Sequence, residues 1–233
     1  MNTLSTAGIR YYRPRVKGPE QALENAVTAS LSTVFDRNDW PRWVGGSVPI
    51  GAGFPDIVSA WYNPQIISLA DFQAADGHIL AYLRSVRRAK IDTIADRLQF
   101  SVRKLKRRID RLEGSEAIKQ LGNQTVSISP CWRKILPEVV TVEAKVSHWQ
   151  AALQQANRNR IFAHRSYVAL PESVAFRVSD TVGFVKHGVG IISVSKCGDV
   201  RVHRPAKKNK PTVWNYYFHL AALAARDIND RSS

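Results

Sequence analysis

The stretch Glu138-Val139-Val140-Thr141-Val142-Glu143-Ala144-Lys145-Val146 is the most informative part of the chain. Its apolar, β-branched composition predicts a strand buried among other elements. Alternate residues of a strand face the same side, so Thr141, Glu143 and Lys145 share one face. Burying an acid and a lysine costs on the order of several kcal/mol unless both are compensated. A structural ion pair or a strand edge open to water would compensate them, and so would a metal ion on Glu143 with Lys145 facing an anionic substrate.

The overall composition indicates a globular protein with a strong positive charge. The 233 residues are 44% hydrophobic, and 34 lysines and arginines oppose 19 acids, giving a formal net charge of +15. Such a charge favours a polyanionic partner, most often a nucleic acid. No apolar run reaches the roughly 18 residues that a membrane span needs, and we expect no membrane association. Two cysteines are too few for a disulfide framework, so we expect a reducing, cytoplasmic setting.

Strands and helices alternate on both sides of this stretch. A helix is expected at about 19–36, a strand at 54–61, a helix at 147–163, a strand at 166–171, a helix at 172–186 and strands at 188–194 and 200–203. A last apolar helix is expected at about 212–226 and should pack on the body of the protein. Strand-helix-strand order implies right-handed parallel crossovers. The predicted fold class is therefore α/β (α+β), with a mixed central sheet flanked by helices.

Residues 66–129 differ in character from the rest. The apolar spacing predicts three short helices, at about 76–87, 91–98 and 102–113, followed by a hairpin with a two-residue turn at Gly122-Asn123. This order is typical of a winged helix-turn-helix, whose third helix lies in a major groove. Six basic residues lie on the surface of the third helix: Arg103, Lys104, Lys106, Arg107, Arg108 and Arg111. Their mutual repulsion within one helix is most easily explained if DNA phosphates neutralise them, although a solvated helix face is the alternative.

Three further acids are candidates for a site with Glu143. Asp56 follows Pro55 at the start of a predicted strand, among apolar neighbours, although Pro-Asp is also a common turn. Glu20 and Glu24 lie near the apolar stripe of the first helix. On a helical wheel Glu20 is about 25° from the centre of the stripe and Glu24 about 65°, so Glu20 is the acid expected to point inward. Glutamate in a first helical turn also complements the helix dipole.

The residues Pro55-Asp56 and Glu143-Ala144-Lys145, in this order of elements, resemble the PD-(D/E)XK, or restriction-endonuclease-like, nuclease superfamily. Glu20 resembles the first-helix glutamate of some branches, and Gln154 resembles a glutamine found in the helix after the motif, so Gln154 and Glu24 are supporting candidates. The resemblance covers about 18–62 and 138–203. The long interval between Asp56 and Glu143 implies an inserted domain. The predicted domains are a discontinuous nuclease-like core, 1–65 and 130–233, and a winged-helix domain, 66–129.

The residues also suit phosphodiester hydrolysis on chemical grounds. A divalent cation polarises the phosphate and lowers the pKa of an attacking water, and hard oxygen ligands favour Mg²⁺ or Mn²⁺. Asp56 and Glu143 would supply these ligands, with Glu20 and the carbonyl of Ala144. Lys145 would orient or deprotonate the water and steady the developing charge. Three arginines are predicted either to contact the substrate backbone or to form a solvated surface: Arg158, Arg160 and Arg165.

The leading functional prediction is thus a metal-dependent DNA endonuclease that engages duplex DNA through the winged helix. One alternative is a non-catalytic DNA-binding regulator, or a subunit of a defence or mobile-element complex, that uses the nuclease-like core as a scaffold. Another is a nuclease that cuts RNA. A homodimer or a partner protein subunit would suit cleavage of two strands.

Overall fold

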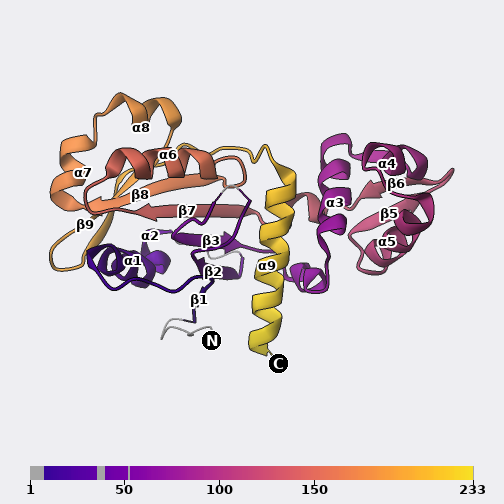
Figure 1. Cartoon of the computed structure of the whole chain (residues 1–233), viewed down its shortest axis with the longest axis horizontal. Coiled ribbons are helices and arrows are strands. Elements are labelled where there is room, and N and C mark those ends of the chain that lie inside the picture. Colours follow the sequence, from indigo (N-terminus) through magenta and orange to yellow (C-terminus); the bar gives the residue numbers. More distant parts are fainter. Residues whose placement is uncertain (1–7, 36–39, 52, 233) are drawn as a thin grey trace. The chain divides into compact units, whose positions relative to one another are not determined.

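The computed structural model describes residues 8–35, 40–51 and 53–232 and shows a mixed α/β fold, which confirms the predicted class (Figure 1). The chain divides into two compact units. The first, here called the sheet unit, comprises Met1–Tyr62 and Glu138–Thr212. The second, here called the helical unit, comprises Asn63–Pro137 and Val213–Ser233. No helix among the described residues is both long and apolar enough to cross a membrane.

The sheet unit is built on a mixed seven-stranded sheet with the order β1-β2-β3-β7-β8-β9-β10. The central strand β7 is buried at every residue, as its composition predicts. It pairs with β3 in antiparallel and with β8 in parallel orientation, and β9 continues the parallel part. The strands are β1 (Arg10–Tyr11), β2 (Arg42–Gly46), β3 (Ile57–Trp61), β7 (Glu138–Ala144), β8 (Arg165–Pro171), β9 (Gly190–Val194) and β10 (Val200–Arg204).

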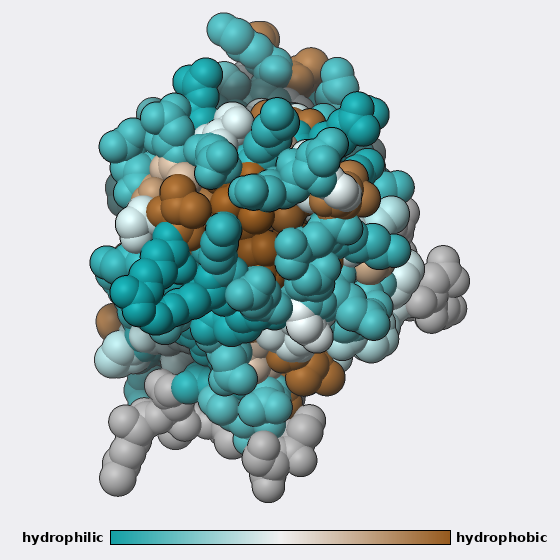
Figure 2. Space-filling model, turned by 90° about the vertical axis from the view of Figure 1, so that its right-hand side faces the viewer, coloured by the Kyte–Doolittle hydropathy of each residue, from teal (hydrophilic) through white to brown (hydrophobic). Residues whose placement is uncertain are grey.

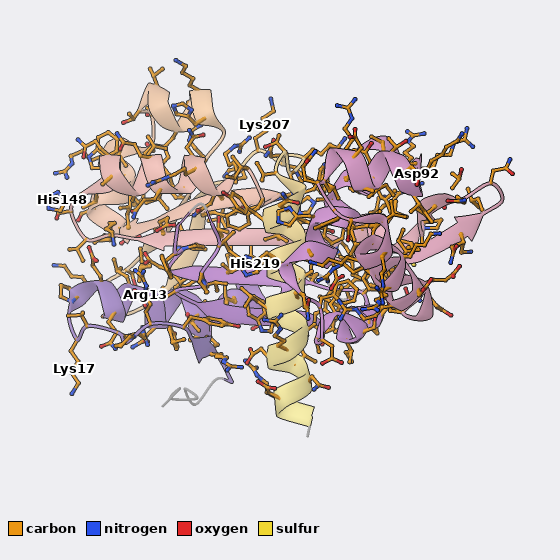
Figure 3. All side chains as sticks on the ribbon, turned by 45° about the vertical axis from the view of Figure 1, so that its right-hand side comes forward. Arg13, Lys17, Asp92, His148, Lys207 and His219 are labelled. Atoms are coloured by element: carbon orange, nitrogen blue, oxygen red, sulfur yellow. The ribbon has the colours of Figure 1, made fainter. Side chains whose placement is uncertain are left out.

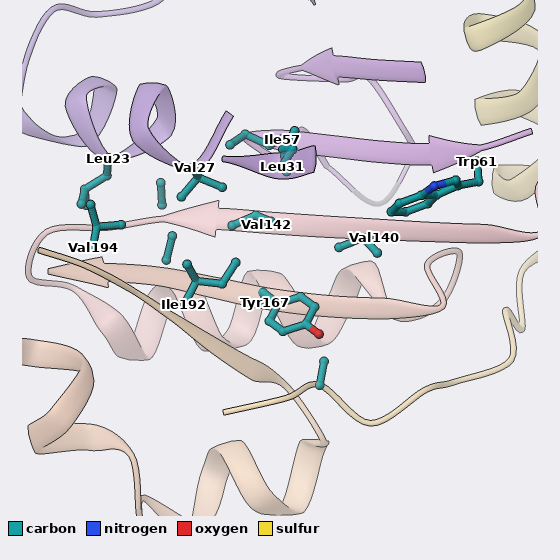
Figure 4. Packing of buried hydrophobic residues seen from close by; sticks show 13 residues of the cluster. Leu23, Val27, Leu31, Ile57, Trp61, Val140, Val142, Tyr167, Ile192 and Val194 are labelled. Atoms are coloured by element: carbon teal, nitrogen blue, oxygen red, sulfur yellow. The ribbon is translucent and has the colours of Figure 1, made fainter. Parts of the chain in front are cut away.

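Helices cover both faces of this sheet (Figure 1). On one face, α1 (Pro19–Ala29) and α2 (Leu31–Val34) pack their apolar stripe against the β7 valines, as Figure 4 shows for Val27 and Val142. On the other face, α6 (Trp149–Asn159), α7 (Glu172–Val178) and α8 (Val182–His187) pack against the alternate residues of β8 and β9. The single helix expected at 172–186 is therefore two helices, separated by a turn in which Thr181 N–H donates to the carbonyl of Val178.

The helical unit contains helices and a small antiparallel sheet with the order β4-β6-β5. In chain order its elements are the 3-10 helix η1 (Pro64–Leu69), α3 (Ala74–Val86), β4 (Arg88–Lys90), α4 (Ile91–Arg97), α5 (Val102–Gly114), β5 (Ile118–Leu121), β6 (Thr125–Ile128), the 3-10 helix η2 (Cys131–Lys134) and α9 (Trp214–Ser232). Leu121 pairs with Thr125, so residues 122–124 connect β5 and β6. The connection is one residue longer than predicted, and Asn123 and Gln124 within it both take positive φ angles, 59° and 54°.

The C-terminal helix α9 belongs to the helical unit, whereas the predicted boundary placed it with the nuclease-like core. The Tyr217 hydroxyl accepts a hydrogen bond from Leu136 N–H at 2.8 Å and donates one to the Leu136 carbonyl at 2.9 Å. Arg226 donates to the carbonyls of Ala70 and Phe72, at the end of η1. An apolar stripe predicts that one side of a helix is buried, but it does not indicate which element covers that side. The sequence therefore could not assign α9 to one of the two units.

Candidate functional site

Strand pairing brings Asp56 and Glu143 side by side. Ile57 pairs with Val142 in the antiparallel ladder between β3 and β7, so the preceding Asp56 lies opposite Glu143. The Asp56 Oδ2 accepts a hydrogen bond from Ala144 N–H at 2.8 Å, and the Asp56 carbonyl accepts one from Ser47 N–H at 3.0 Å. Residues directly opposite in a ladder project to the same face. The two acids predicted as catalytic, separated by residues 57–142, therefore meet at one end of the sheet.

Lys145 completes this group from a position just beyond the end of β7. Its ammonium lies 3.0 Å from Glu20 Oε2 and 3.8 Å from Asp56 Oδ2. Its backbone N–H donates to the carbonyl of Ala169, in β8, at 3.1 Å. Leaving the regular strand at Ala144 frees the lysine side chain to reach α1. The lysine consequently links the first helix to the acid on β3.

The two glutamates of α1 have different environments from those that the helical wheel predicts. Glu24 is the more buried, with 16% of its side chain exposed against 44% for Glu20. Glu24 is held by Arg15, whose Nε donates to its Oε2 at 3.0 Å. Burial, followed by repulsion from Asp56, raises the pKa of Glu24. Glu20 thus reaches the lysine from a half-exposed position, and Glu24 belongs to the electrostatic surroundings of Asp56.

Asn159, at the last turn of α6, is a site residue that sequence reasoning missed. It is 3% exposed, and its Nδ2 donates to Glu143 Oε1 at 2.6 Å. A signal was present, because Asn159 continues the buried stripe of Ala152 and Ala156 at helical spacing. A polar residue on such a stripe needs a buried partner.

Gln154, the predicted supporting residue of the same helix, is exposed on the surface. Its neighbour Gln155 is half-buried, and its Oε1 is buried without a hydrogen-bond partner among the described residues. Gln155 precedes Asn159 by one helical turn, so the two side chains lie on the same side of α6. Of the two glutamines, Gln155 rather than Gln154 therefore lies on the side of α6 that carries Asn159.

The two facing acids have perturbed pKa values. Burial, followed by repulsion from Asp56, raises the pKa of Glu143 from its ordinary value of 4.5 to about 8. Burial also raises the pKa of Asp56, although the hydrogen bond from Ala144 N–H and the charge of Lys145 oppose the rise. The two side chains are hydrogen-bonded to each other, and the raised pKa of Glu143 favours a protonated Glu143 as the donor to Asp56. Two adjacent buried carboxylates repel each other when both are ionised, and a cation between them would remove this repulsion.

Lys145 keeps its charge in this setting. Burial by itself would lower its pKa, but the carboxylates of Asp56, Glu20 and Glu143 raise it above its ordinary value of 10.5. A lysine that stays protonated cannot accept a proton from water. It can neutralise a negative charge placed beside Asp56.

The carboxylates of the site meet part of the requirements of a divalent cation. Among the described residues, no group of three or more histidine, cysteine, aspartate or glutamate side chains is arranged to hold a metal ion. Asp56 and Glu143 nevertheless supply two adjacent hard carboxylates. Mg²⁺ in nucleotide-processing sites commonly binds one or two carboxylates and completes its shell with water and substrate phosphate. The acids therefore fit a magnesium or manganese ion of that type, in which Ala144 would add only its main-chain carbonyl.

Two of the six basic residues predicted to bind DNA also form ion pairs within the helical unit. Arg108 and Arg111, on α5, both form ion pairs with Asp76 of α3, whose side chain is 0% exposed. Asp76 also accepts a hydrogen bond from Gln73 N–H at 2.9 Å and so caps α3. These contacts join α5 to α3 within the helical unit. The other four residues are exposed and form no ion pair within the described part of the chain: Arg103, Lys104, Lys106 and Arg107. Arg111 is also exposed, and Arg108 is half-buried.

The three arginines predicted beside the substrate also have separate roles. Arg160 donates to the carbonyls of Gly188 and Lys207 and thereby anchors the loop after β10. Arg165 lies 2.9 Å from the buried carboxylate of Glu138, at the opposite end of β7 from Glu143. Arg158 alone remains exposed and available. Hydrogen bonds to carbonyls explain the position of Arg160, and an ion pair with a buried acid explains that of Arg165, without a substrate.

No protein-family model matches the chain, and comparisons with curated proteins and with solved structures found no significant match.

Proposed function

We propose that the chain is a metal-dependent nuclease of the PD-(D/E)XK type that hydrolyses phosphodiester bonds in DNA. The observation that carries the proposal is the meeting of Asp56, Glu143 and the charged Lys145 at one end of the sheet. Two adjacent buried acids that share a proton are costly in the absence of a cation. Such an arrangement is typical of sites where function, rather than stability, determines the residues.

Each group has a defined part in the proposed reaction. Asp56 and Glu143 would hold the ion, and Asn159 would keep Glu143 Oε1 in place through its 2.6 Å hydrogen bond. A bound Mg²⁺ or Mn²⁺ supplies Lewis-acid activation of the phosphate and of water. The protonated Lys145 would balance the negative charge that develops on the phosphate oxygens. Because the pKa of Lys145 is raised, the lysine is better suited to stabilising charge than to accepting a proton as a general base.

We further propose that the helical unit is a winged helix-turn-helix that binds duplex DNA. The order α3-β4-α4-α5-β5-β6, with β6 between the other two strands, supports this proposal. Four exposed basic residues of α5, Arg103, Lys104, Lys106 and Arg107, would lie against DNA, while Arg108 and Arg111 pair with Asp76 of α3. The face toward the viewer in Figure 2 is mainly hydrophilic, with a smaller apolar area near its centre.

The test is cleavage of plasmid and linear duplex DNA in the presence of Mg²⁺ or Mn²⁺. We expect wild-type protein to cut, and Asp56→Asn or Lys145→Ala to abolish cutting while DNA binding persists. Folded protein that binds DNA but leaves it intact with both ions would refute the enzyme. Competition between duplex DNA and RNA at one salt concentration distinguishes a DNA nuclease from one that acts on RNA.

One observation favours the second candidate, a non-catalytic DNA-binding protein. Lys145 already lies within 4 Å of carboxylates from Glu20 and Asp56 and could serve as the structural counter-ion of both acids. In that case the group would stabilise the end of the sheet and need no metal. Binding of Mn²⁺, followed by its paramagnetic effect on the NMR signals of Asp56 and Glu143, separates the two candidates, because the scaffold protein would show no site-specific broadening.

A further inference from the structure

An arginine stacked on an aromatic ring lies next to the candidate site. The Arg13 guanidinium carbon is 3.1 Å from the centroid of the Phe54 ring. Both side chains are exposed, with Phe54 at 40%. Phe54 precedes Asp56 by two residues, which places the stacked pair close to the acids. Figure 3 shows Arg13 on the side of the sheet unit where α1 lies.

The backbone on both sides of this pair is held in place. Tyr12 N–H donates to the carbonyl of Gly46, which extends the parallel pairing of β1 with β2. A side chain at Gly46 would overlap the Tyr11 ring, so glycine permits this close approach. On the other side, the carbonyls of Pro55 and Asp56 accept hydrogen bonds from Val48 and Ser47. The guanidinium is therefore presented by two anchored segments rather than by a free tail.

Arg13 differs from its neighbour Arg15 in having no anionic partner among the residues that the structure describes. Arg15 stacks on Tyr11 and is neutralised by Glu24 at 3.0 Å. Arg13 has no ion pair or hydrogen bond with any residue that the structure describes. Stacking covers one flat face of a guanidinium and leaves its N–H groups, which lie in the plane, open to an anion. A pre-positioned, unpaired guanidinium is suited to a phosphate.

We infer that Arg13, held by Phe54, binds a backbone phosphate of the nucleic acid next to the phosphodiester at Asp56 and Glu143. This inference rests on the proposed nuclease and names a positioning residue for it. Arg13 would fix the register of the bound strand relative to the two acids. The site would recognise phosphate and carry no base specificity, because stacking and ion pairing leave the base edges unread.

The experiment measures DNA affinity against salt concentration in EDTA, so that it requires no cleavage. One lost phosphate contact reduces the slope of log K against log salt by about 0.9 for duplex DNA. Between 1 M and 0.1 M salt, the affinity of such a variant therefore rises about eightfold less than that of the wild type. We expect this loss in Arg13→Ala. Arg13→Lys should retain the slope, and Phe54→Leu should weaken binding because the guanidinium is no longer held. Lys210→Ala is the matched control, since Lys210 is exposed on the loop whose Asn209 N–H donates to His164, at the opposite end of the sheet.

An equal fall in slope for Arg13→Ala and Lys210→Ala would show that net charge alone acts and would overturn the inference. An unchanged slope in Arg13→Ala, or wild-type protein that binds no nucleic acid, would overturn it as well. Arg13→Lys keeps the test decisive if Arg13→Ala is unstable, because a slope restored by lysine requires the charge at this position. Failure of the nuclease proposal would instead appear as intact DNA despite Arg13-dependent binding.

Discussion

The substitution Glu143→Gln should stabilise the metal-free protein at alkaline pH. Glutamine has the shape of the protonated glutamate, so its carbonyl can accept from Asn159 and its amide can donate to Asp56. The wild-type carboxyl has a pKa of about 8 in the folded state against 4.5 ordinarily. The folded state therefore binds more protons between these pH values. The contribution of Glu143 to the free energy of unfolding is therefore fully present below about pH 4.5. It is lost as the pH rises to about 8.

The size of this loss follows from the two pKa values. The interval from 4.5 to about 8 corresponds to about 5 kcal/mol at about 1.4 kcal/mol per pH unit. This is a ceiling, because relaxation and water penetration lower the cost of a buried charge. A difference of about 2–3 kcal/mol between variant and wild type above pH 8 would already be decisive. Near pH 5 the two proteins should have similar stability.

Urea unfolding in EDTA, followed by tryptophan fluorescence at several pH values, measures the difference. Wild-type stability should decline from pH 5 to pH 9, whereas that of Glu143→Gln should decline less. Mg²⁺ should stabilise the wild type at alkaline pH by mass action and leave the variant unaffected. If the free energy of unfolding depended on pH in the same way for both proteins, the raised pKa of Glu143 and its proton-sharing with Asp56 would be refuted. Equal stabilisation of both by Mg²⁺ would place the ion elsewhere.

Three further predictions concern groups around the two units. Asp76→Ala removes a helix cap and the acceptor of two arginines. It should therefore destabilise the helical unit by about 2–4 kcal/mol in thermal unfolding. A variant as stable as the wild type would contradict this. Asn159→Ala should cost about 1–3 kcal/mol and raise the pKa of Glu143 further, as seen by carboxyl NMR, whereas Asn157→Ala on the same helix should change neither. Arg107→Ala should weaken DNA binding and lower its salt slope by about 0.9; an unchanged slope would remove α5 from the DNA contact.

Much of the sheet unit can be predicted from residue pattern alone. The buried strand around Val140 and Val142, the helices before and after it, and the parallel crossovers all appear where periodicity places them. The candidate site is only partly visible in this way. Glu143 and Lys145 attract notice because they interrupt an apolar run, but nothing local shows that Asp56 is the cross-strand partner of Glu143. That depends on the register of β3 against β7, a contact between distant segments.

The basic residues show the same division. Local sequence identifies α5 as an amphipathic helix with a positively charged surface, but it cannot tell a ligand-binding arginine from one committed to a buried acid. Arg108 and Arg111 both pair with Asp76, more than thirty positions earlier in the chain. Arg13 and Arg15 show the converse: both are visible in the sequence as basic residues, but only the structure shows that Arg15 pairs with Glu24 while Arg13 stacks on Phe54.

The sequence by itself determined that a strand carrying an acid and a lysine would be buried, because hydrophobicity and alternation are local properties. Tertiary structure decided which groups surround that strand. It placed Asp56 opposite Glu143, brought Asn159 to Glu143 Oε1, and assigned α9 to the helical unit. The physical reason is that periodicity specifies which side of an element is covered, while strand register and helix packing specify by what.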